Sequence, residues 1–182
     1  MKNILFLLLA AFALISCETV WDEPFSTSAE LPDSEGYYQT TAGDFILKYK
    51  VIENNMLACR LSGNGTGWIA VGFDPSAQMR DANFIIGYVA GIYGVIRDDF
   101  GTSSTSHNAD TSLGGTNDVL LISNSETAGR TMLEFELPLD SGDAKDKPLS
   151  VGNTYNVIFA AGSEDDVDSM HNRIASGSIL IR

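Results

Sequence analysis

The sequence predicts an all-β protein, an antiparallel β-sandwich built from residues 37–182. Short runs rich in valine, isoleucine, phenylalanine and tyrosine recur along this region, separated by glycine, asparagine, aspartate and serine, as strands are separated by turns. No long stretch has the 3.6-residue periodicity of an amphipathic helix. So many short strands in a region of this length favour two packed sheets in a single domain.

The chain begins with a leader and a tether that we expect to lie outside the sandwich. Lys2 precedes the apolar run 4–15, and Cys17 follows shortly, an order that resembles a bacterial lipoprotein signal. The run is too short to span a bilayer, which takes about 20 residues. We expect a signal peptide over 1–16, a lipid on Cys17 and a flexible tether over 17–36. The lipid would hold the protein on a membrane of the bacterial cell envelope, facing the periplasm or the cell surface. An ordinary secretory signal cut elsewhere is the alternative.

The predicted strands follow the tether. Trp68–Phe73 and Tyr155–Ala161 are apolar almost throughout, which indicates cover on both faces or a lining for a large ligand. Gly72, Gly87 and Gly94 lie within strands, where they permit either a kink or close approach by a ligand. The expected strands are Phe45–Lys50, Asn55–Leu61, Gly67–Phe73, Asn83–Ala90, Ile92–Arg97, Val119–Asn124, Thr131–Leu137, Tyr155–Ala161 and Ile174–Ile181.

A long loop and a single cysteine are two further features of the predicted sandwich. The longest region without a clear pattern is 98–117, a polar loop long enough to suggest a function, and it contains His107. Cys59 alternates with Leu57 and Leu61, so we expect it to be a buried structural thiol.

The composition limits the partners and the chemistry of the chain. The formal net charge is -13 and no basic cluster is present, so nucleic acid and anionic headgroups are poor partners. Two histidines and one free cysteine cannot assemble a usual zinc or copper site. The acidic stretches 140–146 and 164–168 lack EF-hand spacing, and we expect them to be solvated loops. No nucleophile elbow or phosphate-binding glycine-rich loop indicates an enzyme.

Met79 and His171 stand in polar loops where neither has an evident structural role. A thioether and a neutral imidazole on opposite faces of a porphyrin form an axial pair for haem iron that leaves no open coordination position. If the preceding strands end at the same edge of the sandwich, the two loops could flank a flat macrocycle. Each residue also has an ordinary alternative, because Met79 could pin its loop to the core and His171 could bond to acidic neighbours. Met170 and His107 are competing ligands.

Several distinctive motifs follow one another along the chain. They are the Gly-Trp-Ile-Ala-Val-Gly-Phe strand at 67–73, the loop with Met79, the apolar strand 83–89, Val-Ile-Arg-Asp at 95–98, the phenylalanine strand and turn at 135–143, and Ala-Ala-Gly at 160–162 before the His171 loop. Their order resembles the DOMON domain family in its haem-binding cytochrome branch, over about residues 37–182. Leu137 stands where the family usually has arginine, and Asp81-Ala82-Asn83 stands where many members have an Ala-Asp pair.

The resemblance implies an immunoglobulin-like sandwich that holds haem b without covalent attachment, with Met79 and His171 as the axial ligands of the iron. The chain lacks Cys-x-x-Cys-His, which agrees with non-covalent binding. Arg80 and Arg173 adjoin the two ligands and could pair with haem propionates. Apolar walls are expected from Trp68, Phe73, Phe84, Tyr88, Tyr93 and Phe159.

The function implied by the resemblance is single-electron transfer by a lipid-anchored b-type cytochrome, a carrier and not an enzyme. Its acidic surface would steer an unidentified redox partner that has a basic docking face. A non-catalytic carbohydrate or small-ligand binding module is the alternative, because DOMON relatives include such sandwiches. Under that alternative Tyr37, Tyr38 and Tyr93 could stack on a sugar ring, and Met79 and His171 would be ordinary loop residues.

Overall fold

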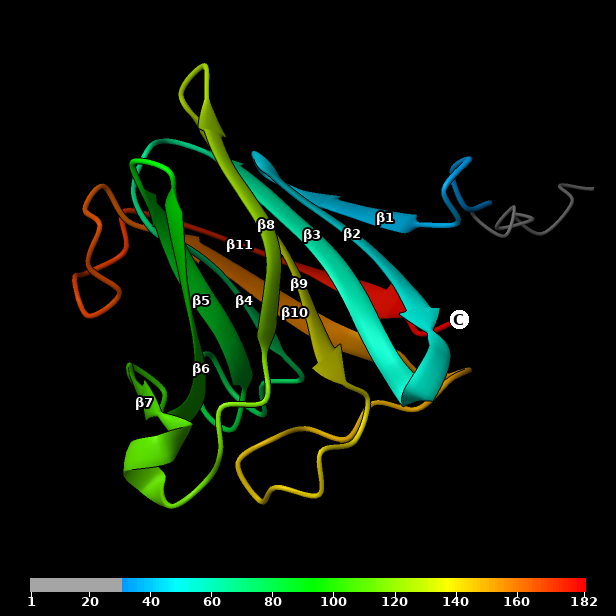
Figure 1. The fold of residues 1–182 in the computed structure, drawn as a ribbon. Coiled ribbons are helices and arrows are strands. Elements are labelled where there is room, and N and C mark those ends of the chain that lie inside the picture. The colour runs from blue at the N-terminus through cyan, green and yellow to red at the C-terminus, as the bar shows by residue number, and fades with distance from the viewer. Residues whose placement is uncertain (1–30) are drawn as a thin grey trace, which may run out of the picture. The chain divides into compact units, whose positions relative to one another are not determined.

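The computed structural model describes residues 31–182, which form two antiparallel sheets packed face to face (Figure 1). The first sheet has the strand order β1-β2-β3-β9-β8, and the second has the order β11-β10-β4-β5-β6-β7. The predicted all-β sandwich is therefore confirmed. The expected signal peptide 1–16, the lipid on Cys17 and most of the tether 17–36 lie outside the described residues. Within the described part, no helix is long and apolar enough to cross a membrane.

Every strand that the sequence predicts is found, and β5 has its predicted bounds. Two further strands, β1 and β7, were not predicted. The elements in chain order are β1 (Tyr38–Ala42), β2 (Phe45–Ile52), η1 (Glu53–Asn55), β3 (Met56–Asn64), β4 (Ile69–Phe73), β5 (Asn83–Ala90), β6 (Tyr93–Ser103), β7 (Ser106–Ala109), η2 (Asp110–Leu113), β8 (Leu120–Thr127), β9 (Arg130–Pro138), β10 (Thr154–Ala161) and β11 (Arg173–Leu180).

The main core lies between the sheets and follows from alternation along the strands. Every second residue of β2, β3 and β9 is buried against the second sheet, and the rings of Phe45 and Phe159 stack across the core with centroids 5.6 Å apart. Cys59 is fully buried in this core, as predicted. Burial raises the pKa of the Cys59 thiol, so the thiol is neutral and inert.

The outer face of the second sheet is also apolar. Trp68, Ala70 and Ile86 form a second buried cluster there, completed by Val167 from the loop between β10 and β11. This cover on both faces explains why β4 and β10 read as almost continuous apolar runs.

The region 98–117 is more ordered than the sequence predicts. β6 continues to Ser103 and turns back into β7, with a register irregularity between Gly101 and Ser103, and η2 follows. β7 is a polar edge strand whose backbone pairing does not require an apolar face, so alternation did not reveal it. At the described end of the expected tether, Asp33 forms an ion pair with Lys48 at 2.8 Å.

Candidate functional site

A cavity of about 1040 Å³ opens on the outer face of the second sheet. Its floor is apolar and comes from β4, β5, β10 and the residues that lead into them. Its rim comes from the loops at 78–79 and 168–171, and from the turn between β6 and β7 with the start of β7, at 104–107. The apolar residues of the floor are Trp68, Ala70, Phe84, Ile86, Ile158 and Ala160.

Met79 and His171 both line this cavity. Met79 follows β4 and His171 follows β10, two strands that pair antiparallel with Phe73 opposite Val157 and Ile69 opposite Ala161. The two loops therefore leave the sheet at opposite ends, so the shared edge that the sequence analysis considered as a condition is not present. Each loop folds inward over the outer face, so a ligand in the cavity has one loop on either side.

The loop that carries Met79 is held in a fixed shape by its own backbone. Ser76 N–H donates to the Arg80 carbonyl at 2.9 Å, and Asp81 N–H donates to the Gly101 carbonyl of β6 at 2.8 Å. Gln78 and Asp81, on either side of Met79, have positive φ angles of 54° and 60°. Such conformations cost energy for residues with side chains and persist only where the surroundings impose them.

Gly101 is the residue of β6 that permits this arrangement. A Cβ atom at position 101 would lie 1.8 Å from the Met79 carbonyl oxygen, far inside the 3.0 Å that real Cβ contacts respect. Gly101 N–H also donates to the Ala82 carbonyl at 2.9 Å. The position of Met79 therefore depends on a glycine in a different strand.

The loop that carries His171 is tied to the cavity floor through Trp68. The indole N–H of Trp68 donates to Ser169 Oγ at 2.9 Å, and its backbone N–H donates to the Glu164 carbonyl at 3.0 Å. At the end of the loop, Asn172 N–H donates to the Ala161 carbonyl at 2.9 Å. His171 itself is exposed, as is its neighbour Met170.

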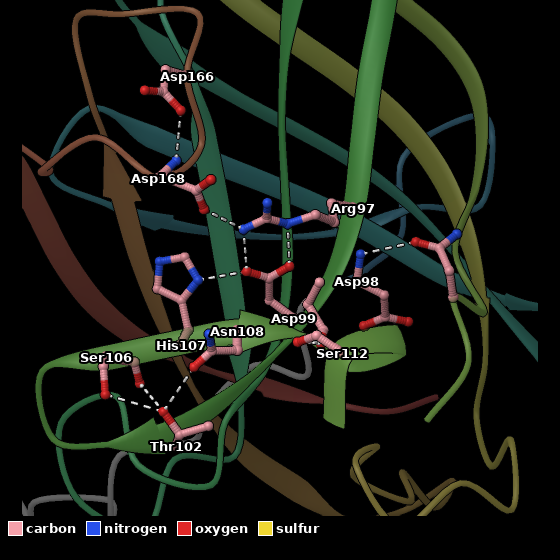
Figure 2. A network of polar contacts seen from close by, with 12 residues as sticks. Arg97, Asp98, Asp99, Thr102, Ser106, His107, Asn108, Ser112, Asp166 and Asp168 are labelled. Atoms are coloured by element: carbon pink, nitrogen blue, oxygen red, sulfur yellow. Dashed lines mark hydrogen bonds and ion pairs between the residues drawn. The ribbon is translucent and has the colours of Figure 1, made fainter. Parts of the chain in front are cut away.

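A buried carboxylate, Asp99, joins the wall of the cavity to the His171 loop (Figure 2). Arg97 donates to both Asp99 oxygens at 2.5 and 2.7 Å, and it also donates to Asp168 at 2.8 Å. Nδ1 of His107 lies 2.5 Å from Asp99. Burial opposes the charge of Asp99, but the hydrogen bonds from His107 and Arg97 hold its pKa below the ordinary value. Sequence reasoning missed this network, because nothing in the local pattern shows that 97–107 meets Asp168.

His107, which the sequence left as a competing ligand, also lines the cavity. Its ring is half-buried and lies 5.6 Å from the ring of Phe84. Its bond to Asp99 occupies Nδ1 and fixes the orientation of the ring. Nε2 is the nitrogen of His107 that remains for a ligand. Met170 lines the cavity as well.

The predicted aromatic walls divide between the two faces of the sheet. The rings of Trp68 and Phe84 line the cavity, whereas Phe159 borders it but turns its ring into the main core, where it stacks on Phe45. Phe73 is fully buried in the main core instead, because alternation along β4 turns it away from Trp68 and Ala70. The structure therefore assigns Phe73 to the core and not to the cavity.

Two other predicted aromatics are not cavity residues. Tyr88 packs against the cluster formed by Trp68, Ala70, Ile86 and Val167 but does not line the cavity. Tyr93 lies at the start of β6 and is 73% exposed.

Neither predicted arginine lines the cavity. Arg173 forms an ion pair with Asp44 and donates to the Asn64 carbonyl, so it ties the start of β11 to the first sheet. Arg80 is exposed beside Met79. Among the described residues, no lysine or arginine lines the cavity.

Comparison with known proteins places this fold in a family. The DOMON domain model matches residues 41–162, which include the cavity floor and Met79 and end before His171. The chain belongs to the DOMON family.

Two solved structures resemble this DOMON domain. The cytochrome b domain of pyranose dehydrogenase from Coprinopsis cinerea has a TM-score of 0.57 at 16% identity, covering 79% of this chain and 80% of that one. The cytochrome domain of Myriococcum thermophilum cellobiose dehydrogenase has a TM-score of 0.59 at 9% identity, covering 82% of this chain and 85% of that one. At these identities the comparison concerns the fold.

The size, apolar floor and facing donors of this cavity are compatible with a flat macrocycle such as haem b. A cavity of about 1040 Å³ is at the upper end of the range for small-molecule sites, its floor is apolar, and a thioether and an imidazole approach it from opposite ends of the sheet. Met79 and His171 would hold the iron if such a group were bound. The aromatic floor would cover the macrocycle and exclude water.

Proposed function

We propose that this DOMON domain binds one haem b without covalent attachment, through Met79 and His171, and transfers single electrons. The observation that carries the proposal is the convergence of these two residues on one cavity from loops at opposite ends of the sheet. The two similar structures are both cytochrome domains of dehydrogenases, which supports the proposal.

The ligand set determines the kind of chemistry that we propose. Bound haem would supply a one-electron redox centre, and a methionine–histidine pair favours the reduced iron and so raises the potential. Because both axial positions would be filled, no position remains for oxygen or peroxide, and we propose a carrier and not an enzyme. The rigid Met79 loop would hold the thioether in place in both oxidation states.

The charge and the amino-terminal sequence support the proposed setting. A net charge of -13 would steer a redox partner with a basic docking face, most strongly at low salt. The signal-like segment 1–16 and Cys17 support attachment to the bacterial cell envelope through a lipid. Fractionation of cells that make the Cys17→Ser variant tests this setting, because that variant should leave the membrane fraction.

The visible absorption spectrum tests the haem proposal. The purified protein, titrated with haemin and reduced with dithionite, should show the sharp α band of low-spin six-coordinate haem b. Met79→Ala and His171→Ala should each lose that band. Met170→Ala and His107→Ala are matched controls within the same cavity, and both should keep it.

Each other outcome of this experiment has a defined meaning. If His107→Ala loses the band and His171→Ala keeps it, the ligand assignment is wrong while the function stands. A folded protein that takes up no haemin would refute the proposed function.

The alternative, a carbohydrate-binding module, is supported by a different part of the cavity. The hydroxyl groups of 104–106, Ser169 and Ser176 line it beside the aromatic floor, a combination that suits a sugar. The tyrosines first considered for this role do not contribute. Tyr37 is buried beneath Lys50, whose amine lies 4.2 Å from the ring centroid. Glycan binding by a colourless protein would favour this alternative.

A further inference from the structure

Three aspartates from separate segments meet at a place outside the haem cavity. Asp98 belongs to β6, Asp110 to η2, and Asp146 to the connection between β9 and β10. One carboxylate oxygen from each lies within 4.8 Å of those of the other two. Asp98 is 2% exposed and Asp110 is fully buried. The acidic stretch 140–146, expected to be solvated, therefore contributes Asp146 to a largely buried cluster.

Several oxygens in this cluster have no hydrogen-bond partner. Both oxygens of Asp110 and Oδ1 of Asp98 are buried without one. None of the three aspartates forms an ion pair in the described part of the chain. Lys145 is the nearby cation that weakly favours the charge of Asp110, and its amine lies over the ring of Phe100 at 5.3 Å. Buried polar atoms without partners are costly and rare.

A neutral side chain, Asn83, borders the cluster and can add a fourth oxygen to it. Asn83, the first residue of β5, is only 4% exposed, and its amide donates to Asp146 Oδ1 at 2.9 Å. Its own Oδ1 is buried and has no partner. Rotation of the carboxamide by a half turn would place this oxygen among the carboxylates, and the two orientations are nearly isosteric.

The electrostatics of the cluster are unfavourable without a counter-ion. Burial, followed by the charges of Asp146 and Asp110, raises the pKa of Asp98 to about 8. Burial and neighbouring carboxylates also raise the pKa of Asp110 to about 7. Carboxylates held together in this way either bind protons or bind a cation.

We propose that Asp98, Asp110, Asp146 and Asn83 bind one Ca²⁺ ion. The donors are all oxygens, which excludes a preference for zinc or copper. Ca²⁺ accepts six to eight oxygen ligands in a flexible geometry at about 2.3–2.6 Å. Mg²⁺ demands an octahedral site and usually keeps several waters. A cluster whose members are this deeply buried therefore fits Ca²⁺ better than Mg²⁺.

The position of the cluster gives the ion a structural role. The ion would join β5, β6, η2 and the connection between β9 and β10. Asn83 directly follows the Met79 loop in the chain, so the ion would also fix one end of that loop. Because the ion binds the folded state only, it should raise stability by mass action.

Thermal unfolding of the haem-free protein tests the proposal independently of the proposed function. After treatment with EDTA and its removal, CaCl₂ at 100 times the dissociation constant should raise Tm by about 5–10 °C. MgCl₂ at the same concentration should have a smaller effect. Calorimetric titration with CaCl₂ should show one site per chain.

Two variants with the same change of charge give the control. Asp110→Asn should lose the response to CaCl₂, and without calcium it should unfold at or above the temperature of the calcium-free parent because repulsion is reduced. Asp165→Asn, an exposed acid of the His171 loop, should keep the full response.

Three results would overturn the proposal. The first is that CaCl₂ gives neither binding heat nor a Tm shift in the parent protein. The second is that MgCl₂ raises Tm as much as CaCl₂ does. The third is that Asp110→Asn keeps the full Tm rise with CaCl₂. If that variant does not fold, the titration of the parent protein still decides.

Discussion

Replacement of Gly101 by alanine tests whether the Met79 loop is positioned from β6. The new Cβ would lie 1.8 Å from the Met79 carbonyl oxygen, so the loop must retreat by at least 1.2 Å to reach the 3.0 Å limit of real contacts. The hydrogen bonds of Gly101 with Asp81 and Ala82 oppose that movement. Overpacking of this kind costs about 1–3 kcal/mol. For a domain of this size, Tm should fall by roughly 2–12 °C.

The effect on the proposed haem site should be larger than the effect on stability. A ligand displaced by about 1 Å loses much of its bonding geometry, so Gly101→Ala should weaken haem binding or convert the reduced spectrum to a high-spin form. Haemin titration and the dithionite spectrum measure both effects. Gly177→Ala in β11 is the control, because its Cβ would have ordinary contacts of 3.5 Å or more. A Gly101→Ala protein with the parent's Tm and spectrum would refute the reasoning.

Three further predictions concern the rest of the domain. In a Cys17→Ser background, Cys59 should not react with a thiol reagent at pH 8 until the protein is unfolded in guanidinium, because burial raises its pKa and blocks access; rapid reaction of the folded protein would contradict this. The hydrogen bond from Lys48 lowers the pKa of Asp33 to about 2 from 3.8, so its contribution to stability is full above pH 4 and lost as pH falls towards 2. Asp33→Asn should remove that part of the acid dependence, and urea melts from pH 5 to 2 measure it. Arg173→Ala should lower the urea midpoint by breaking the tie to the first sheet but leave the haem spectrum intact, and loss of the spectrum would restore its proposed role at the propionates.

The strands could be predicted from sequence because alternation and apolar runs record burial directly. Phe45–Lys50 and Thr131–Leu137 bury every second residue, and both were found. β1 and β7 are polar edge strands, so backbone pairing holds them without an apolar signature. Edge strands of this kind become visible only once their neighbours are placed.

The candidate site could be predicted only in part. Met79 and His171 could be proposed by residue type and by family motif, and the structure places both at one cavity. The sequence could not show that the two loops leave the sheet at opposite ends, because this depends on which strands pair. The wrong placement of Phe73 in the cavity has a similar cause. Its position depends on which face of β4 is turned to the core, and residue type alone does not show this.

The acidic cluster could not be predicted from the sequence at all, because its members come from segments that meet only in the fold. Asp98, Asp110 and Asp146 belong to separate segments, and nothing in the sequence near Asp146 separates it from the solvated acids around it. The cluster exists because β6, η2 and the connection after β9 meet in space.

The pairing of β4 with β10 also sets the order in which the cavity can form. Its floor needs strands that are far apart in the sequence, and its second rim follows β10, so the cavity cannot exist until β10 and the loop after it have been synthesised. Contacts between such distant segments form late, because closing long loops is entropically costly. A cofactor that occupies this cavity must therefore be acquired after β10 has paired with β4.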